Sequence, residues 1–344
     1  MGRRLFVASA LGAFLASKQS VVAADVIVSG GGSSFSRPIV QRWIDAMPKA
    51  TGVSASFAVM GSGTAHTRIL SGDIDFATTE IALPDEQLAN SNLAQFPIAF
   101  GALACVVNIP GIAANRLRLN GALLAGIYGG TIAKWNDPKI VAANAGLALP
   151  DLDIRPLRLD LPDGSVFSTT AAFTQYLLAT NPDWQAKFGD SIGKRRWAVG
   201  SMAGTADALA ETVKVLPGSI GYMALGSALS GNFATVLLTN KAGEPVAADL
   251  ASLNAAVEAV NWAQVPNMVA SMIDLPGHGV WPLVLTTYVL MSRAPKNTAH
   301  STSLRSFLDF ATGGGANNIT LSSAVPVPPA IRRKAAALLG TNPS

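Results

Sequence analysis

Three strand-like runs of this chain end in short turns of glycine and hydroxyl residues, and each turn opens a helix-like run. The turns lie in GGGSSF (residues 30–35), MGSGTA (60–65) and LPDGSVFSTT (161–170). Alternation of strand-like and helix-like segments predicts an α/β fold rather than a β-sandwich or a helix bundle. With 344 residues, the chain is long enough for two such domains or one large one.

The helix predicted after the first turn shows the pattern most clearly. Pro38 is tolerated in its first turn, and Gly52 ends it. Its apolar residues fall on one face, namely Ile39, Val40, Trp43, Ile44 and Met47. The helix after the third turn is predicted to bury Ala172, Phe173, Tyr176 and Leu177.

Each of these turns offers hydroxyl donors and a helix start with free backbone N–H groups. A helix N-terminus carries roughly half a positive charge, so three converging starts suit a small dianion better than an apolar ligand. A plainer interpretation stays open, because a strand-to-helix turn requires glycine for close backbone approach or a positive φ in any case.

The first 24 residues have the composition of a cleaved secretory signal peptide. Arg3 and Arg4 precede the apolar run Leu5–Ala16, and the segment ends in the small residues Val22–Ala24. The apolar run is shorter than the about 20 residues that a membrane span requires, so we expect no membrane insertion and a soluble mature protein.

The single cysteine, Cys105, rules out internal disulfides in an exported chain. It lies in the apolar run ALACVVNI, which indicates a buried, inert thiol. Export, together with the lack of a lipid-carrying cysteine near the cleavage point, predicts a periplasmic location.

Much of the apparent basicity belongs to the signal segment. Removing Arg3, Arg4 and Lys18 changes the balance of basic to acidic residues from 25 against 21 to 22 against 21. This removes the main support for nucleic-acid binding. The basic clusters at Lys194–Arg196 and Arg332–Lys334 are interpreted as solvated surface.

Known catalytic and nucleotide-binding patterns are missing from the sequence. It has no G-x-x-x-x-G-K-[ST], complete G-x-G-x-x-G or G-x-S-x-G run. The three histidines, His66, His278 and His300, are scattered, which argues against a metal site. We expect no cofactor, no metal and no enzymatic activity, although a Ser/His/Asp triad built from distant residues stays open.

An ordered series of motifs resembles the periplasmic phosphate-binding receptors of phosphate ABC transporters, which have the type II periplasmic binding protein fold. The motifs follow in the order that is typical of that family and extend over nearly the whole mature chain. They are GGGSSFSRPIVQRW, GSGTAHTRILSGDIDFATTE, FPIAFGALACVVNIPGI, IYGGTIAKWNDPKI, LPGSIGYMALGSA and WPLVLTTYVLM.

The resemblance implies two α/β lobes with a ligand cleft, joined by two hinge crossovers near Val106–Pro110 and Trp281–Thr286. The signal peptide would occupy residues 1–24. Lobe I would be discontinuous, with residues 25–107 and 286–344, and lobe II would comprise residues 108–285. Ligand binding would close the hinge because the ligand has higher affinity for the closed state.

In the first two motifs, three residues match phosphate contacts of the family. Ser34 matches a hydroxyl donor, Phe35 a backbone N–H donor, and Ser62 the hydroxyl donor of the second turn. Each could instead cap its own helix, and one serine can serve both roles.

Glu80 stands where the family usually has an aspartate that accepts a hydrogen bond from a protonated phosphate oxygen. A carboxylate there selects phosphate over fully ionised sulfate, which offers only repulsion. Glutamate keeps this chemistry but reaches about 1.5 Å further, which matters in a tight site. The alternative is an exposed residue.

The third turn is longer than its counterpart in the family. Arg158 and Asp160 keep the arginine and aspartate spacing, so Arg158 would contact phosphate oxygens and Asp160 would orient its guanidinium. Ser168, Thr169 and Thr170 supply hydroxyls at the helix start. Arg158 could instead be a surface residue at a strand end, and Asp163-Gly164 a simple turn.

These observations predict a non-enzymatic periplasmic receptor that binds inorganic phosphate and delivers it to the membrane permease subunits of an ABC transporter. We expect a monomer. One alternative is a diverged receptor for another oxyanion or a phosphate ester in the same cleft. Others are a secreted phosphatase-like protein, for which the sequence shows no activated nucleophile or metal, and an interaction protein without a ligand.

Overall fold

A mixed ten-stranded sheet crosses the whole molecule and gives it an α/β fold. The computed structural model describes residues 27–160, 167–188, 197–295, 298–313 and 323–340. The segment predicted as a signal peptide and the Lys194–Arg196 cluster therefore lie outside the described residues. The sheet runs in the order β2 (Ser54–Val59), β1 (Ile27–Gly32), β3 (Phe76–Thr79), β12 (Val284–Ser292), β4 (Leu93–Val107), β8 (Ser219–Ala224), β6 (Arg155–Leu159) and β7 (Ser201–Ala203).

Short strands and twelve described helices complete the chain. Strands β13 (Ala324–Pro326) and β9 (Ala234–Thr235) also pair with β4, and β11 (Pro245–Val246), β10 (Leu237–Thr239) and β5 (Arg118–Leu119) form a second sheet. The helices are α1 (Arg37–Thr51), α2 (Ser62–Ser71), α3 (Asp85–Asn90), α4 (Gly121–Tyr128), α5 (Pro138–Ala143), α6 (Ser168–Thr180), α7 (Asp183–Phe188), α8 (Ala206–Val215), α9 (Leu225–Ser230), α10 (Leu250–Glu258), α11 (Thr298–Thr312) and α13 (Pro329–Leu339).

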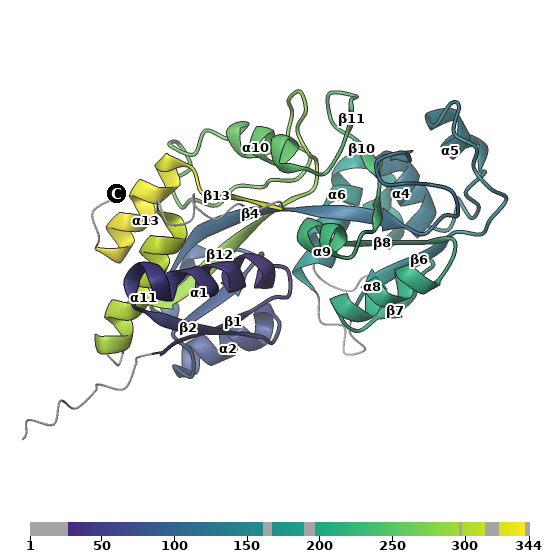
Figure 1. Cartoon of the computed structure of the whole chain (residues 1–344). Helices are drawn as coiled ribbons and strands as arrows, with labels where there is room; N and C mark the ends of the chain where they lie inside the picture. The colour runs from purple at the N-terminus through teal and green to yellow at the C-terminus, as the bar shows by residue number, and fades with distance from the viewer. Residues whose placement is uncertain (1–26, 161–166, 189–196, 296–297, 314–322, 341–344) are drawn as a thin grey trace, which may run out of the picture.

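Strand β4 belongs to both halves of the sheet. Its 15 residues are all buried, and its partner changes within the strand: Leu93–Ala102 pairs with β12, and Leu103–Val107 pairs with β8. Figure 1 shows β4 running from one half of the molecule into the other. Burial on both faces explains why its sequence reads as a nearly continuous apolar run rather than an alternating one.

Helices cover the two halves separately. Helices α1, α2, α11 and α13 pack on β1, β2, β3 and β4 in the first half, and α6 and α8 pack on β6 and β8 in the second (Figure 1). Parallel pairing of β1 with β2 and β3 brings the carboxyl ends of these three strands to one edge. Loops that follow them therefore lie together.

The two helices predicted in most detail are confirmed. Helix α1 buries Ile39, Val40, Trp43 and Met47, has Pro38 in its first turn and ends at Gly52, whose φ of 74° is left-handed. Helix α6 buries the four predicted residues, Ala172, Phe173, Tyr176 and Leu177. Within the described part of the chain, no helix is both long and apolar enough to cross a membrane.

Cys105 and Trp281 belong to the core where the two halves join. The Cys105 side chain is buried, and burial raises the pKa of its thiol to about 12, so the prediction of an inert thiol is confirmed. The Trp281 indole is fully buried, and its Nε1–H donates to the Leu103 carbonyl over 3.2 Å. This contact ties the segment before β12 to the position where β4 changes partner.

We expect Trp281→Ala to lower the free energy of unfolding by about 3–5 kcal/mol, because it leaves a large cavity and an unpaired Leu103 carbonyl. Chemical denaturation followed by far-ultraviolet circular dichroism measures the change. Val215→Ala, on a side chain that is 76% exposed, is the control and should stay within about 0.5 kcal/mol of the parent. A Trp281→Ala loss below 1 kcal/mol would contradict this account.

Candidate functional site

The three turns singled out in the sequence precede helices that have no side-chain cap. Among the described residues, the N-cap positions of α1, α2 and α6 (Ser36, Gly61 and Phe167) accept no hydrogen bond from their own helix through a side chain. Four other helices are capped in this way, by Asn120 in α4, Asp137 in α5, Thr205 in α8 and Asp249 in α10, whereas α3, α9 and α13 also lack a side-chain cap. The first N–H groups of α1, α2 and α6 are thus left for water or a ligand.

The first two turns touch through the backbone. The Gly32 carbonyl accepts hydrogen bonds from the N–H groups of Met60 and Gly61, each over 3.1 Å. Ser34 and Phe35 follow Gly32, and Ser62 is the first residue of α2. The predicted contacts of the first and second motifs therefore lie on neighbouring loops, with Ser34 and Ser62 half-buried and Phe35 buried.

The glycines of the first turn are required for close approach rather than for a positive φ. A Cβ at Gly30 would overlap the Phe76 ring, and one at Gly32 would overlap the Thr78 side chain and lie 2.8 Å from its carbonyl oxygen. None of Gly30–Gly32 has a positive φ. The glycines let β1 lie against the side chains of β3, which supports the plainer interpretation for the glycines themselves.

Glu80 joins the end of β3 to the start of α6. Its Oε2 accepts a hydrogen bond from Ser168 Oγ over 2.6 Å, between residues 88 positions apart. Its Oε1 is buried and has no hydrogen-bond partner among the described residues. Glu80 is half-buried, so the alternative of a simple exposed residue does not describe it.

Burial raises the pKa of the Glu80 carboxyl above its ordinary value, because the charged form loses hydration. The hydrogen bond from Ser168, the backbone N–H of Glu80 and the nearby Ser33 and Thr287 hydroxyls, which approach the carboxylate without completing a hydrogen bond to Oε1, oppose this effect. Ser33 was not among the predicted site residues. The sequence could have indicated Ser33, because it precedes Ser34 in the same run of glycine and hydroxyl residues.

Arg158 and Asp160 form an ion pair at the end of β6. Arg158 Nη1 lies 2.5 Å from Asp160 Oδ2, and the two side chains are only 24% and 14% exposed. Arg158 Nε also donates to the Gly200 carbonyl over 3.2 Å, and its guanidinium lies 6.0 Å from the centre of the Trp197 ring. These contacts hold the guanidinium in place. The alternative of a freely exposed arginine at a strand end therefore does not describe Arg158.

The three hydroxyl residues at the start of α6 have different surroundings. The Thr170 hydroxyl donates to the Leu159 carbonyl over 2.5 Å and lies 2.8 Å from the Tyr222 hydroxyl, so it faces the core and ties α6 to β6. Ser168 bonds Glu80, and the Thr169 side chain is buried. Asp163, Gly164 and the rest of 161–166 lie outside the described residues.

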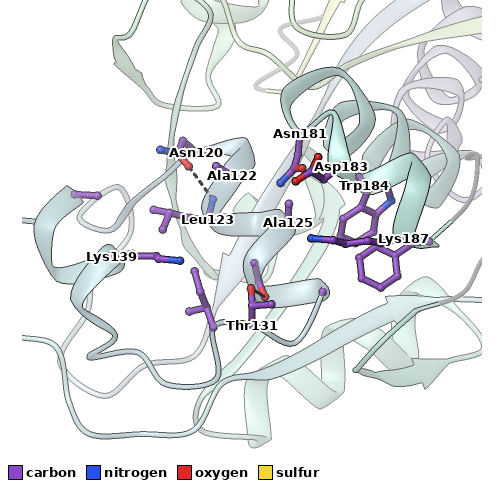
Figure 2. A pocket seen from close by; sticks show the side chains of 15 residues that line it. Asn120, Ala122, Leu123, Ala125, Thr131, Lys139, Asn181, Asp183, Trp184 and Lys187 are labelled. Carbon is purple, nitrogen blue, oxygen red and sulfur yellow. Dashed lines mark hydrogen bonds between the residues drawn. The ribbon is translucent and has the colours of Figure 1, made fainter.

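A cavity of about 480 Å³ adjoins Glu80 and Ser168. A second cavity, of about 720 Å³, lies between α4, α5 and α7, and Lys139 and Lys187 extend into it from opposite sides (Figure 2). None of the predicted site residues lines this second cavity. Among the described residues, no group of three or more His, Cys, Asp or Glu side chains could hold a metal ion.

A serine, an aspartate and a histidine do meet elsewhere, but not in the order of a catalytic triad. Ser29 Oγ donates to Asp75 Oδ2 over 2.8 Å, and His300 Nδ1 lies 3.1 Å from Asp75 Oδ1. A nucleophilic serine must be hydrogen bonded to the histidine, with the carboxylate behind it. Here the serine hydroxyl bonds the carboxylate directly, so this group does not activate Ser29.

Comparisons with known proteins identify the family and the fold of the chain. The model of the PBP superfamily domain matches residues 18–314. The phosphate-binding protein PstS of Xylella fastidiosa (strain Temecula1) is 33% identical over 304 residues, which are 88% of this chain and 82% of that protein. PstS of Haemophilus influenzae is 32% identical over 302 residues, 88% of this chain and 89% of that one.

Among solved structures, a high-affinity periplasmic phosphate-binding protein, PfluDING, bound with phosphate, has a TM-score of 0.70 at 19% identity. The match covers 91% of this chain and 93% of that one. At this identity the likeness concerns the fold, and it confirms the predicted periplasmic binding protein architecture.

The raised pKa of Glu80 predicts a pH-dependent stability difference. As pH rises above the ordinary value for glutamate, the unfolded chain loses the proton before the folded chain does, and the native state becomes less stable. We expect Glu80→Gln, which keeps an acceptor for Ser168, to melt at a higher temperature than the parent at pH 7. The difference should shrink toward pH 4.5.

Thermal unfolding in phosphate-free buffer across this pH range measures the effect. Glu258→Gln, at an exposed position of α10, is the control and should melt as the parent does throughout. A Glu80→Gln melting temperature equal to the parent's at pH 7 would show that the carboxylate is well solvated.

Proposed function

The chain belongs to the PstS family of phosphate-binding proteins, within the PBP superfamily, and from that premise we propose that it binds inorganic phosphate and delivers it to the permease of an ABC transporter. One observation carries the proposal: loops from β1, β2 and β3 meet the start of α6, and the helices α1, α2 and α6 at this junction lack side-chain caps.

Hydroxyl and backbone N–H dipoles that are held in fixed positions would stabilise most of the anion's negative charge. The hydroxyls of Ser34, Ser62 and Thr169 and the N–H of Phe35 would donate to phosphate oxygens, with the free N–H groups of α6 beside them. Thr170 would contribute through its backbone, since its hydroxyl bonds Leu159. These donors need little rearrangement, so little ordering entropy opposes binding.

Arg158 would supply the permanent positive charge of the site. Its pairing with Asp160 fixes the plane of the guanidinium, and a planar guanidinium can contact two phosphate oxygens at once. The link from Thr170 to the Leu159 carbonyl supports this role, because it keeps the residue after Arg158 against the start of α6.

Glu80 would distinguish phosphate from sulfate. Its Oε2 is occupied by Ser168, and its Oε1 is buried and without a partner among the described residues. A phosphate P–OH group would donate to Oε1 and satisfy it, whereas sulfate has no proton to donate at neutral pH.

A hinge between the two halves would enclose the anion. The change of β4's partner between Ala102 and Leu103 supports a division into two lobes, for which we propose residues 25–107 with 286–344 as lobe I and residues 108–285 as lobe II. Contacts from Glu80 to Ser168 and from Arg37 to Asp207, at 2.6 and 3.8 Å, cross between these lobes. Ligand would favour the closed arrangement by bonding both lobes at once.

The receptor would act as a monomer in the periplasm, exported by a signal peptide in residues 1–24, and would hydrolyse nothing. Its partners would be phosphate and the membrane permease subunits. The junction of Glu80, Ser168 and the three helix starts suits capture and release better than bond cleavage, since it offers donors and one acceptor without an activated nucleophile among the described residues.

Isothermal titration calorimetry of protein stripped of phosphate tests the proposal. The parent should bind phosphate and bind sulfate far more weakly. Glu80→Gln and Arg158→Ala should each weaken phosphate binding about tenfold or more, since a hydrogen bond to a charged group contributes about 1.5–3 kcal/mol.

Lys187→Ala is the matched control, because it removes a cation from the second cavity and should leave phosphate binding unchanged. Parental affinity in both Glu80→Gln and Arg158→Ala would mean that the anion binds elsewhere. Equal affinity for sulfate would favour the alternative of a receptor for other oxyanions.

A further inference from the structure

The cavity of about 480 Å³ is lined by Glu80 and Ser168, but by none of Ser34, Phe35, Ser62, Arg158 and Thr169, the residues proposed to donate to inorganic phosphate. We propose that it receives the uncharged organic group of a singly substituted phosphoryl anion, so that this protein binds alkyl or aryl phosphonates and phosphate monoesters as well as phosphate. This inference rests on the proposed function, because it uses the same donors for the phosphoryl group.

The size of the cavity fits an organic group. Small-molecule pockets in proteins have volumes of about 300–1,000 Å³, with mostly apolar walls and a few polar groups. One water occupies roughly 30 Å³ in the liquid, so this cavity of about 480 Å³ has room for many water-sized groups. A PO₄ group held by Ser34, Ser62 and α6 would leave it empty.

The cavity meets the proposed phosphate site at the hydrogen bond between Glu80 and Ser168. Both residues belong to its wall, and the Glu80 Oε1 atom is buried without a partner among the described residues. A phosphonate that donates its P–OH to Oε1 therefore has its phosphorus next to the cavity. The substituent on phosphorus would then point into the cavity, whose wall contains none of the proposed donors Ser34, Ser62, Thr169 and Arg158.

Several of the side chains that line the cavity are alanines. Helix α6 contributes one face, on which Ala172 and Ala179 lie one and three turns beyond Ser168. Ala82, after β3, and Ala270 form part of the remaining wall. An alanine ends at Cβ, so the space that larger side chains would fill stays available for a ligand.

The charge of the wall defines the ligand class. Among the described residues that line the cavity, Glu80 is the only acidic one, and there is no lysine, arginine or histidine. Burial raises the pKa of Tyr288, so its phenol is neutral. The organic group must then be uncharged, and Tyr288, Gln175 and Ser271 could bond a polar substituent on it.

Calorimetry at pH 7 with inorganic phosphate and with methyl-, propyl- and phenylphosphonate tests this inference on the full mature chain. The P–C bond prevents hydrolysis. Affinity should rise from methyl- to propylphosphonate by about fourfold for each methylene buried, and phenylphosphonate should bind at least as tightly as propylphosphonate.

Two substitutions test where the organic group lies. Ala172→Leu should weaken propyl- and phenylphosphonate binding at least tenfold while inorganic phosphate stays within twofold of the parent. Ala179→Leu, at an exposed position outside the core, should weaken phenylphosphonate binding alone. Ala337→Leu, an exposed alanine of α13, is the control and should change none of these affinities.

Affinity that is flat or falls from methyl- to phenylphosphonate, with phosphate still bound, overturns this inference and leaves the proposed function intact. Phosphonate binding that neither Ala172→Leu nor Ala179→Leu affects also overturns it, because the group then lies outside the cavity. Failure to bind phosphate and every phosphonate overturns the proposed function, and this inference with it.

Discussion

The buried strand β4 is the constraint on which the arrangement of both halves depends. Nine of its first ten residues pair with β12, and its last five pair with β8, so one continuous strand connects the two halves. The Trp281 indole bonds the strand where the partner changes. The junction that brings Glu80 to Ser168 follows from this geometry, because each residue lies beside a strand of a different half.

The helix starts at the proposed phosphate site lack a stabilising interaction that several other helices of the protein have. An N-cap side chain typically contributes about 0.5–2 kcal/mol to a helix. Helices α4, α5, α8 and α10 have this contribution, whereas α1, α2 and α6 at the proposed site, and α3, α9 and α13 elsewhere, do not. The buried Glu80 carboxylate adds to the cost, since burial disfavours its charged form. A bound anion that forms hydrogen bonds with these groups would stabilise the native state, so ligand binding would raise the free energy of unfolding of the whole protein.

Local sequence patterns predicted the helices correctly. They could not predict contacts between residues that are distant in the sequence. The apolar face and the Gly52 stop of α1 follow from helix periodicity and cap chemistry alone. The bond between Ser168 and Glu80 joins positions far apart in sequence, so no spacing rule could reveal it. The approach of Ser33 to the Glu80 carboxylate is likewise a contact between distant residues, and a cavity lined by alanines such as Ala172 has no sequence signature.

Strand β12 lies between β3 and β4, although it is made long after both. Tyr288 pairs with Thr79 across a gap of more than half the chain. Until the polypeptide is nearly complete, β3 and β4 therefore remain without the neighbour that separates them, and the first half cannot finish its core. Such non-local pairing slows folding. A chain of this topology would keep the first half of its sheet incomplete, and unable to become compact, until its synthesis is nearly finished.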